Sequence, residues 1–438
     1  MMDSFFPLLL LFAFSMLGVL LGTITGLVPG FHPNNVAFIL LSLSPMILGE
    51  LHFLTVLLPS EIILVLVAST ILAASVSHTF LSFIPAAFIG APEGDTALCL
   101  LPAHRLLLEG RAYEATALSA IGSFGAVIFS FLFLIPFYFV FSTFQFYETI
   151  QSHMLYILIG ISTLLVLTES FNDRREVYQA IILSSFVFMV SGLFGYVTLN
   201  MAVHSSFFFR STMLFPALTG LFGLSTILFS LLYTPEIPEQ RIEEPKMEKG
   251  ETAKSVISGS AFGSLVSFLP GITSAHATVL AMLARRNRQP EQVITTLSSV
   301  NTSNVIFCLA TLFLIFRARS GATMAISNLL EVQPWDMVVP PLALIYLLIA
   351  VSIGATFSFF ITKYMGKQFS RLFVKIPYRK MLISIAIFLS VLVFLFTGIL
   401  GLLVGFVAAC IGLIPVFFGV RRSNCMGVIL LPIIIWLW

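Results

Sequence analysis

Charged side chains are scarce in this sequence, and their scarcity excludes several classes of protein. Lys, Arg, Asp and Glu make up 10% of the 438 residues, whereas soluble domains carry roughly 25%. The net charge of +2 is too small to indicate a nucleic-acid partner. Because 58% of the residues are hydrophobic, we expect most of the surface to face a lipid bilayer.

Cysteine clusters and catalytic motifs are also missing. The sequence has no His-Glu-x-x-His, no Gly-x-Ser-x-Gly and no Gly-Lys-Ser/Thr motif. We therefore predict that the protein is not an enzyme and that it has no cofactor and no metal site. No Cys-x-x-Cys occurs, so a disulfide framework is not predicted either; the cysteines are Cys99, Cys308, Cys410 and Cys425.

Long apolar runs, in contrast, fill the chain. A spanning helix needs about 20 apolar residues, and the runs predict an all-α, multi-pass protein of the cell membrane with roughly 10–12 transmembrane segments. The first run exceeds signal-peptide length, so we expect it to be a retained membrane segment. The pieces at 31–48 and 76–90 suit half-helices or re-entrant segments. The other candidates are 5–28, 54–75, 115–143, 154–168, 177–198, 211–233, 255–283, 293–316, 338–361, 381–399, 400–420 and 424–438.

One polar stretch, 234–254, reads as a linker and divides the chain into an N-terminal half (1–233) and a C-terminal half (255–438). Basic residues concentrate in short cytoplasmic loops. The C-terminal half has such a cluster after its first helices, and the corresponding place in the N-terminal half has none, which indicates opposite topologies. The basic residues expected in the cytoplasm are Arg285, Arg286, Arg288, Lys363, Lys367, Arg371, Lys375, Arg379, Lys380, Arg421 and Arg422.

The two halves carry the same unusual motif, in which Pro-Gly interrupts an apolar run and polar residues follow. Paired broken helices in corresponding positions indicate the binding site of a secondary transporter. A helix that restarts inside the membrane offers free N–H groups, which bind carboxylate or phosphate. The alternative is that Pro-Gly only kinks each helix, and the Gly-x3-Gly spacing is typical of close helix packing. The motifs are Gly18, Gly22, Gly26, Pro29, Gly30 and Gly259, Gly263, Ser267, Pro270, Gly271.

Small polar residues beside these motifs are the candidate substrate ligands. Neutral hydroxyl and amide groups could hold an anion or Na⁺, or could simply join helices by hydrogen bonds. The segment Ser75–Phe80 of the first half is matched here to Ser299–Asn304 of the second. The candidates are Thr25, Pro29, Gly30, His32, Asn34, Asn35, Ser77, His78, Thr79, Pro270, Gly271, Thr273, Ser274, His276, Asn301 and Asn304.

Two further features leave alternatives open. Glu61 follows Pro59 in an apolar run, where it could carry a coupling ion or lie near the membrane surface. The loop at 91–111 could gate the site, dock a second copy in a homo-oligomer, or serve as a cytoplasmic connector.

The segments Gly22-Thr-Ile-Thr-Gly26-Leu-Val-Pro29-Gly30 and Gly263-Ser-Leu-Val-Ser267-Phe-Leu-Pro270-Gly271 resemble the large membrane (permease) subunit of tripartite tricarboxylate transporters. The stretch from Pro102 to Glu114 is similar to archaeal members. The resemblance implies transport of a di- or tricarboxylate driven by Na⁺ or H⁺, with a small membrane subunit and an extracytoplasmic binding protein as partners. Translocation of a polyprenyl-phosphate lipid carrier, and a non-transporting role in membrane assembly, stay open as alternatives.

Overall fold

The computed structural model describes residues 2–28, 33–89, 100–144, 146–167, 177–201, 213–232, 238–269, 274–285, 289–373 and 378–438. Within these ranges the regular secondary structure is entirely helical. Eight helices are long and apolar enough to cross a membrane, and three shorter apolar helices accompany them. The prediction of an all-α multi-pass membrane protein is therefore confirmed.

Two triplets of helices, one from each half of the chain, have the same arrangement. In each triplet an interrupted helix is followed by a half-helix and then by a helix that packs along the first one. The first triplet is α1 (Met2–Leu27), α2 (Pro33–Glu50) and α3 (Ser60–Leu81), with the short η1 (Leu51–Val56) between α2 and α3; the second is α12 (Lys249–Val266), α13 (Ser274–Arg285) and α14 (Pro290–Ile315).

Glycines set the close approach within each triplet. A Cβ atom added at Gly18 would lie 2.8 Å from the Cβ of Ala73, and one at Gly26 would lie 2.9 Å from the Cβ of Leu81. The order of these contacts shows that α1 and α3 run parallel. Larger residues would force the two helices apart. The Gly-x3-Gly spacing therefore allows α1 and α3 to pack closely, as the sequence indicates.

The second triplet repeats this register. A Cβ atom at Gly259 would lie 2.9 Å from the Cβ of Ser299, and one at Gly263 would meet the hydroxyl of Ser303. Gly22 meets Ser77 in the same way, at 2.7 Å from its Cβ. Ser77 therefore corresponds to Ser303. The sequence comparison instead matched Ser77 to Asn301, two residues away from Ser303. The segments of α3 and α14 contain no glycine that could align them by sequence alone.

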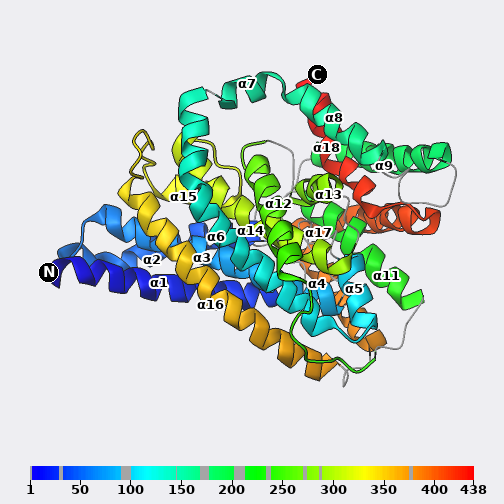
Figure 1. Ribbon diagram of the computed structural model, residues 1–438, viewed down its shortest axis with the longest axis horizontal. Coiled ribbons are helices and arrows are strands. Elements are labelled where there is room, and N and C mark those ends of the chain that lie inside the picture. Colours follow the sequence, from blue (N-terminus) through cyan, green and yellow to red (C-terminus); the bar gives the residue numbers. More distant parts are fainter. Residues whose placement is uncertain are drawn as a thin grey trace.

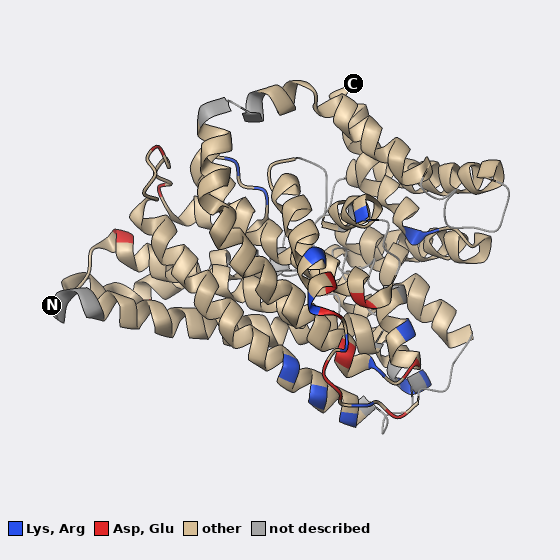
Figure 2. Cartoon of the chain, viewed as in Figure 1, with Lys and Arg blue, Asp and Glu red and all other residues tan. Residues whose placement is uncertain are grey.

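The two triplets run in opposite directions through the molecule. The start of α14 meets a charged cluster, since Arg111 Nη2 donates to Glu291 Oε1 at 2.7 Å. The start of α3 lies at the other end, where Ile63 packs with Leu11 and Ala350. Figure 2 shows the acidic and basic residues concentrated around the segment 238–248 and the ends of neighbouring helices. The repeats are thus inverted with respect to each other, as predicted.

One long helix from each half packs against the triplet of the other half. The helix α6 (Ala112–Phe144) packs on α14 and α12, whereas α16 (Leu342–Phe373) packs on α3 and α1. The α3 and α14 spans are 83% and 78% buried, while no other span exceeds 56%. These two helices therefore form the centre of the molecule. The shorter helices of this core bundle are α4 (Phe83–Ile89), α5 (Leu100–Leu108) and α15 (Gly321–Leu329).

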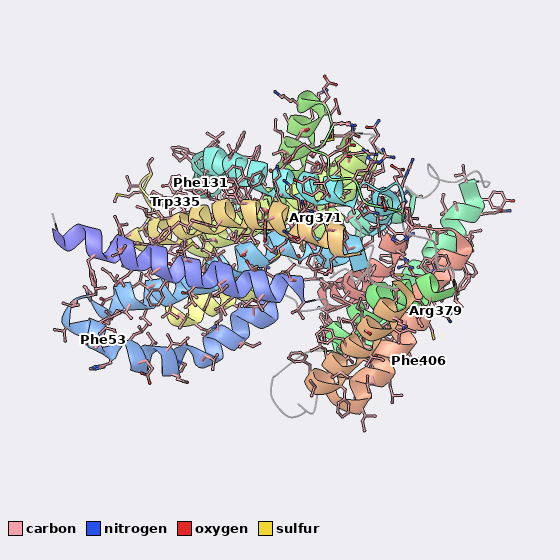
Figure 3. All side chains as sticks on the ribbon, turned by 90° about the horizontal axis from the view of Figure 1, so that it is seen from below. Phe53, Phe131, Trp335, Arg371, Arg379 and Phe406 are labelled. Carbon is pink, nitrogen blue, oxygen red and sulfur yellow. The ribbon has the colours of Figure 1, made fainter. Side chains whose placement is uncertain are left out.

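The remaining helices form a second, peripheral bundle, in which both halves again meet. Figure 3 separates the two parts: Phe53 and Trp335 mark the core bundle, and Phe406 and Arg379 mark the peripheral one. Buried residues of α9 and α17, such as Val187 and Ala408, share one apolar cluster. The peripheral elements in Figure 1 are α7 (Phe146–Ser152), α8 (Met154–Leu167), α9 (Val177–Leu199), α10 (Leu214–Leu218), the π-helical η4 (Thr219–Leu224), α11 (Ser225–Leu232), α17 (Tyr378–Phe418), η5 (Arg422–Met426) and α18 (Gly427–Leu437).

The helix α17 folds back on itself at Gly398, whose φ of 69° lies in the left-handed region that favours glycine. A Cβ atom at Gly405 would lie 4.0 Å from Val393 Cγ1. In a continuous helix these residues would be about 18 Å apart, so α17 is a helical hairpin. The prediction of two separate segments, 381–399 and 400–420, is confirmed.

Residues 238–248 have no regular secondary structure and run over the charged face, and we call this segment the strap. Arg241 N donates to the carbonyl of Gly110 at 2.7 Å. The Tyr113 hydroxyl donates to Glu244 Oε1, and Lys363 Nζ donates to Glu244 Oε2, each at 2.9 Å. The strap thus joins α6 to α16. The predicted linker 234–254 reaches into α12, which already begins at Lys249.

Candidate functional site

Both predicted helix interruptions exist. The helix α1 ends at Leu27 and α12 at Val266, and new helices begin at Pro33 and Ser274. The offset that takes Gly18 to Gly259 also takes Pro33 to Ser274, so the two half-helices start at equivalent positions. Each interruption therefore leaves the first backbone N–H groups of α2 and α13 without a preceding helical turn.

Several predicted site residues lie outside the residues that the structure describes. For three more, only the helical backbone is described. The first group is Pro29, Gly30, His32, Pro270, Gly271 and Thr273; the second is Asn34 and Asn35 in α2 and His276 in α13.

In the first repeat, a buried histidine joins the central helix to α1 just before the interruption. His78 is fully buried, and its Nδ1 lies 3.1 Å from Thr25 Oγ1. The Thr25 hydroxyl donates to the carbonyl of Leu21 at 2.9 Å. Because a hydroxyl has one proton to donate, we assign the donor role in the His78–Thr25 bond to Nδ1–H.

A second polar contact lies one turn earlier. The hydroxyls of Thr23 and Ser77 are 3.3 Å apart, and Ser77 Oγ donates to the carbonyl of Val19 at 3.1 Å. Thr79 differs from these residues, because its hydroxyl donates to the carbonyl of Ser75 in its own helix at 2.9 Å. The structure therefore brings together Thr25, Ser77 and His78, and it leaves Thr79 out of this group.

In the second repeat, the equivalent polar residue joins the central helix to the half-helix after the interruption. Asn304 occupies the position of His78, in the register that pairs Ser77 with Ser303. Its Nδ2 donates to the hydroxyl of Ser274, the first residue of α13, at 3.4 Å. Asn304 thus positions the start of the helix at which the predicted anion would bind.

Cys308 is a member of this group that the sequence did not indicate. Its single S–H proton can be donated to the carbonyl of Ser267, at 3.7 Å from Sγ, or to Asn304 Oδ1, at 3.4 Å. The thiol is buried, as is normal for cysteine. The signal that could have revealed its role is the spacing of four residues from Asn304, which places both side chains on one face of α14.

Buried polar side chains extend along the same stretch of α14. Asn301 and Thr302 are both buried, and the Thr302 hydroxyl has no hydrogen-bond partner among the described residues. An unpaired buried hydroxyl costs free energy unless water or a ligand satisfies it. The middle of α14 is therefore unusually polar for a helix at the centre of a membrane protein.

Two other predicted features lie apart from the interruptions. Glu61 is exposed in the first turn of α3. The described part of the loop at 91–111 forms α5 and a network of ion pairs around Arg111. Hydrogen bonds, first to Glu114 and then to Glu291 and Glu109, raise the pKa of Arg111 above its ordinary value.

Inverted repeats with interrupted helices beside polar central helices are the architecture of secondary transporters. Comparison with known proteins agrees with this class. The chain belongs to the tripartite tricarboxylate transporter TctA family, whose signature matches residues 12–427. It is a membrane component of such a transporter and a multi-pass protein of the cell membrane.

A relative from Methanocaldococcus jannaschii, the uncharacterized protein MJ1079, is 29% identical over 426 residues. The similar region covers 96% of this chain and 97% of the relative. No solved structure matches the chain. The family and the fold therefore agree with the resemblance of the two Pro-Gly segments to this family, including its archaeal character.

Proposed function

We propose that the protein is a secondary active transporter that moves a di- or tricarboxylate, coupled to Na⁺ or H⁺. The observation that carries this proposal is the equivalence of the two interruptions. Each has a half-helix start at the same position and a polar side chain, His78 or Asn304, at the same place on the central helix. Two such helix starts suit a substrate with more than one carboxylate.

The proposed site uses neutral groups. Backbone N–H groups at the starts of α2 and α13 would hold the carboxylates, and hydroxyl, imidazole and amide groups would complete the contacts. The predicted ligands around Gly30 and Gly271 belong to this proposal, and so does the division of the chain into repeats 1–233 and 255–438. Glu61 stays a prediction as a coupling-ion residue, and its exposure favours a different carrier of the ion.

Alternating access would come from movement of one part of each repeat against the rest. The crossed packing of α6 and α16 supports this idea, because each long helix supports the triplet of the other half. As family partners we propose a small membrane subunit and an extracytoplasmic binding protein, and the number of copies of this chain in the assembly stays open.

The test is thermal unfolding of the purified protein with citrate, succinate, other carboxylates and a short-chain polyprenyl phosphate, each with and without Na⁺. A ligand that binds the native state raises the melting temperature in proportion to the logarithm of its concentration. We expect a carboxylate to stabilise the wild type and to lose this effect in Asn304→Ala.

The matched control is Thr79→Val, since the Thr79 hydroxyl bonds only within its own helix among the bonds described. This variant should respond to carboxylates like the wild type. If no carboxylate stabilises the wild type, or if Asn304→Ala responds normally, the proposed site is wrong. Stabilisation by the polyprenyl phosphate alone would instead favour a lipid-carrier translocase.

A further inference from the structure

A groove between α6 and α12 opens sideways on the core bundle, away from both interruptions. Its volume is about 650 Å³, and its walls are apolar. Ile128, Leu132 and Ile257 line it and are more than half exposed. At its floor the helices nearly touch, since a Cβ atom at Gly125 would lie 2.9 Å from two carbon atoms of Val256.

The groove is closed at the charged face of the molecule. Pro245 and Met247 of the strap form this end, and Lys249 and Thr252 in the first turn of α12 line it. From Leu118 to Phe133 the groove follows α6 for about 22 Å, which exceeds the roughly 15 Å of hydrocarbon in one leaflet. Its apolar part thus has the length of an acyl chain, and Lys249 lies at the end that the strap forms.

Lys249 is the basic residue available at this end. Lys246 pairs with Glu243 and Lys254 pairs with Glu251, whereas Lys249 has no ion pair within the described part of the chain. Glu248, at the N-cap of α12, makes no side-chain cap, so within the described part of the chain this side chain leaves the first N–H groups of the helix uncapped. An exposed ammonium beside an uncapped helix start attracts a phosphate.

We propose that this groove binds an anionic phospholipid of the bilayer, with its acyl chain between α6 and α12 and its phosphate at Lys249. The basic loops place the charged face on the cytoplasmic side, where anionic lipids attract juxtamembrane lysines. The lipid would contact the strap as well as one helix from each half. It would therefore stabilise the packing of the strap on the charged face without taking part in substrate binding.

The experiment compares thermal unfolding of the detergent-purified protein during titration with phosphatidylglycerol and with phosphatidylcholine. We expect phosphatidylglycerol to raise the melting temperature at lower concentration than phosphatidylcholine. In Lys249→Gln the half-saturating concentration of phosphatidylglycerol should rise about fivefold, the factor expected for one lysine near an anionic headgroup. Lys254→Gln is the matched control, because Lys254 is on the same helix but does not line the groove.

A second variant tests the apolar part of the groove. Ala253 lines the groove and is exposed, so Ala253→Trp should fill the space and weaken the effect of phosphatidylglycerol while the protein still folds. Equal responses of the wild type and Lys249→Gln would overturn the proposal, and so would equal responses to the two lipids. Stabilisation by a polyprenyl phosphate but not by phosphatidylglycerol would also overturn it. None of these outcomes depends on carboxylate transport.

Discussion

The two helix pairs at the centre of the molecule, α1 with α3 and α12 with α14, share a geometry but differ in chemistry. Glycines hold both pairs in the same register. In the first pair His78 bonds to Thr25 before the interruption, and in the second Asn304 bonds to Ser274 after it. The backbone approach is thus common to both repeats, while the polar contact that positions each interruption is not.

This difference indicates that helix packing restricts the choice of residue more than the polar contact does. Close packing leaves little freedom, because an added carbon at Gly18 or Gly259 meets backbone or Cβ atoms of the neighbouring helix. The polar position tolerates either an imidazole or an amide, since both can supply a hydrogen bond at that place. The packing should therefore be much more sensitive to substitution than the polar contact, and the following predictions test that order.

The largest effect is expected at the packing glycines. Gly22→Leu places a side chain against the backbone carbonyl of Ala74, which cannot move away without shifting α3. We expect a loss of about 3 kcal/mol in the free energy of unfolding, measured by thermal or denaturant unfolding in detergent. Gly160→Ala is the control: beyond its own helix, no atom of the described residues lies within 4 Å of the added Cβ, so this variant should be neutral or slightly more stable. A stable Gly22→Leu protein would mean that the pairs are not held by glycine.

A smaller effect is expected where ion pairs join the two repeats. Arg111 binds Glu114, whose side chain is 7% exposed, and Glu291 of the other half. Because Arg111→Met leaves a nearly buried carboxylate unpaired, we expect about 2 kcal/mol of destabilisation. The double variant Arg111→Met with Glu114→Gln should recover part of it. Failure of this recovery in the same unfolding assay would show that the buried charge is not the cause.

Substitution of the polar residues His78 and Asn304 should lower the free energy of unfolding by less. His78→Ala and Asn304→Ala each remove a hydrogen bond, with an expected loss of about 1 kcal/mol. His78→Asn and Asn304→His, which exchange the chemistry of the two repeats, should lie closer to the wild type than the alanine variants in melting temperature. Exchange variants that are less stable than the alanine variants would contradict the equivalence of the two positions.

The smallest effect is expected at Thr302. Its buried hydroxyl has no partner among the described residues, and valine has nearly the same shape. Thr302→Val should change the free energy of unfolding by less than about 1 kcal/mol, in either direction. Ser303→Ala offers a comparison, because its hydroxyl does bond, to the carbonyl of Val300. A strong loss of stability in Thr302→Val would reveal a partner, such as an ordered water.

Much of the fold could be predicted because its signals are local. Apolar length predicted the long membrane-spanning helices and the two segments that form the arms of α17, and Pro-Gly marked both interruptions. Other features have no local signal. The register of α3 against α1 depends on which carbonyls face Gly18 and Gly22, and the hydrogen bond from Cys308 to Ser267 joins α14 to the residue that follows α12.

The sequence by itself determined that this is a membrane protein with two related halves, because hydropathy and glycine spacing act within single helices. Only the tertiary structure decided which residues meet. It showed that the residue equivalent to Ser77 in the second repeat is Ser303 and not Asn301, that Glu61 is exposed, and that the strap packs against α6 and α16. Contacts between distant segments depend on how whole helices pack, and a change of one or two residues in register along a helix redirects every side chain on it.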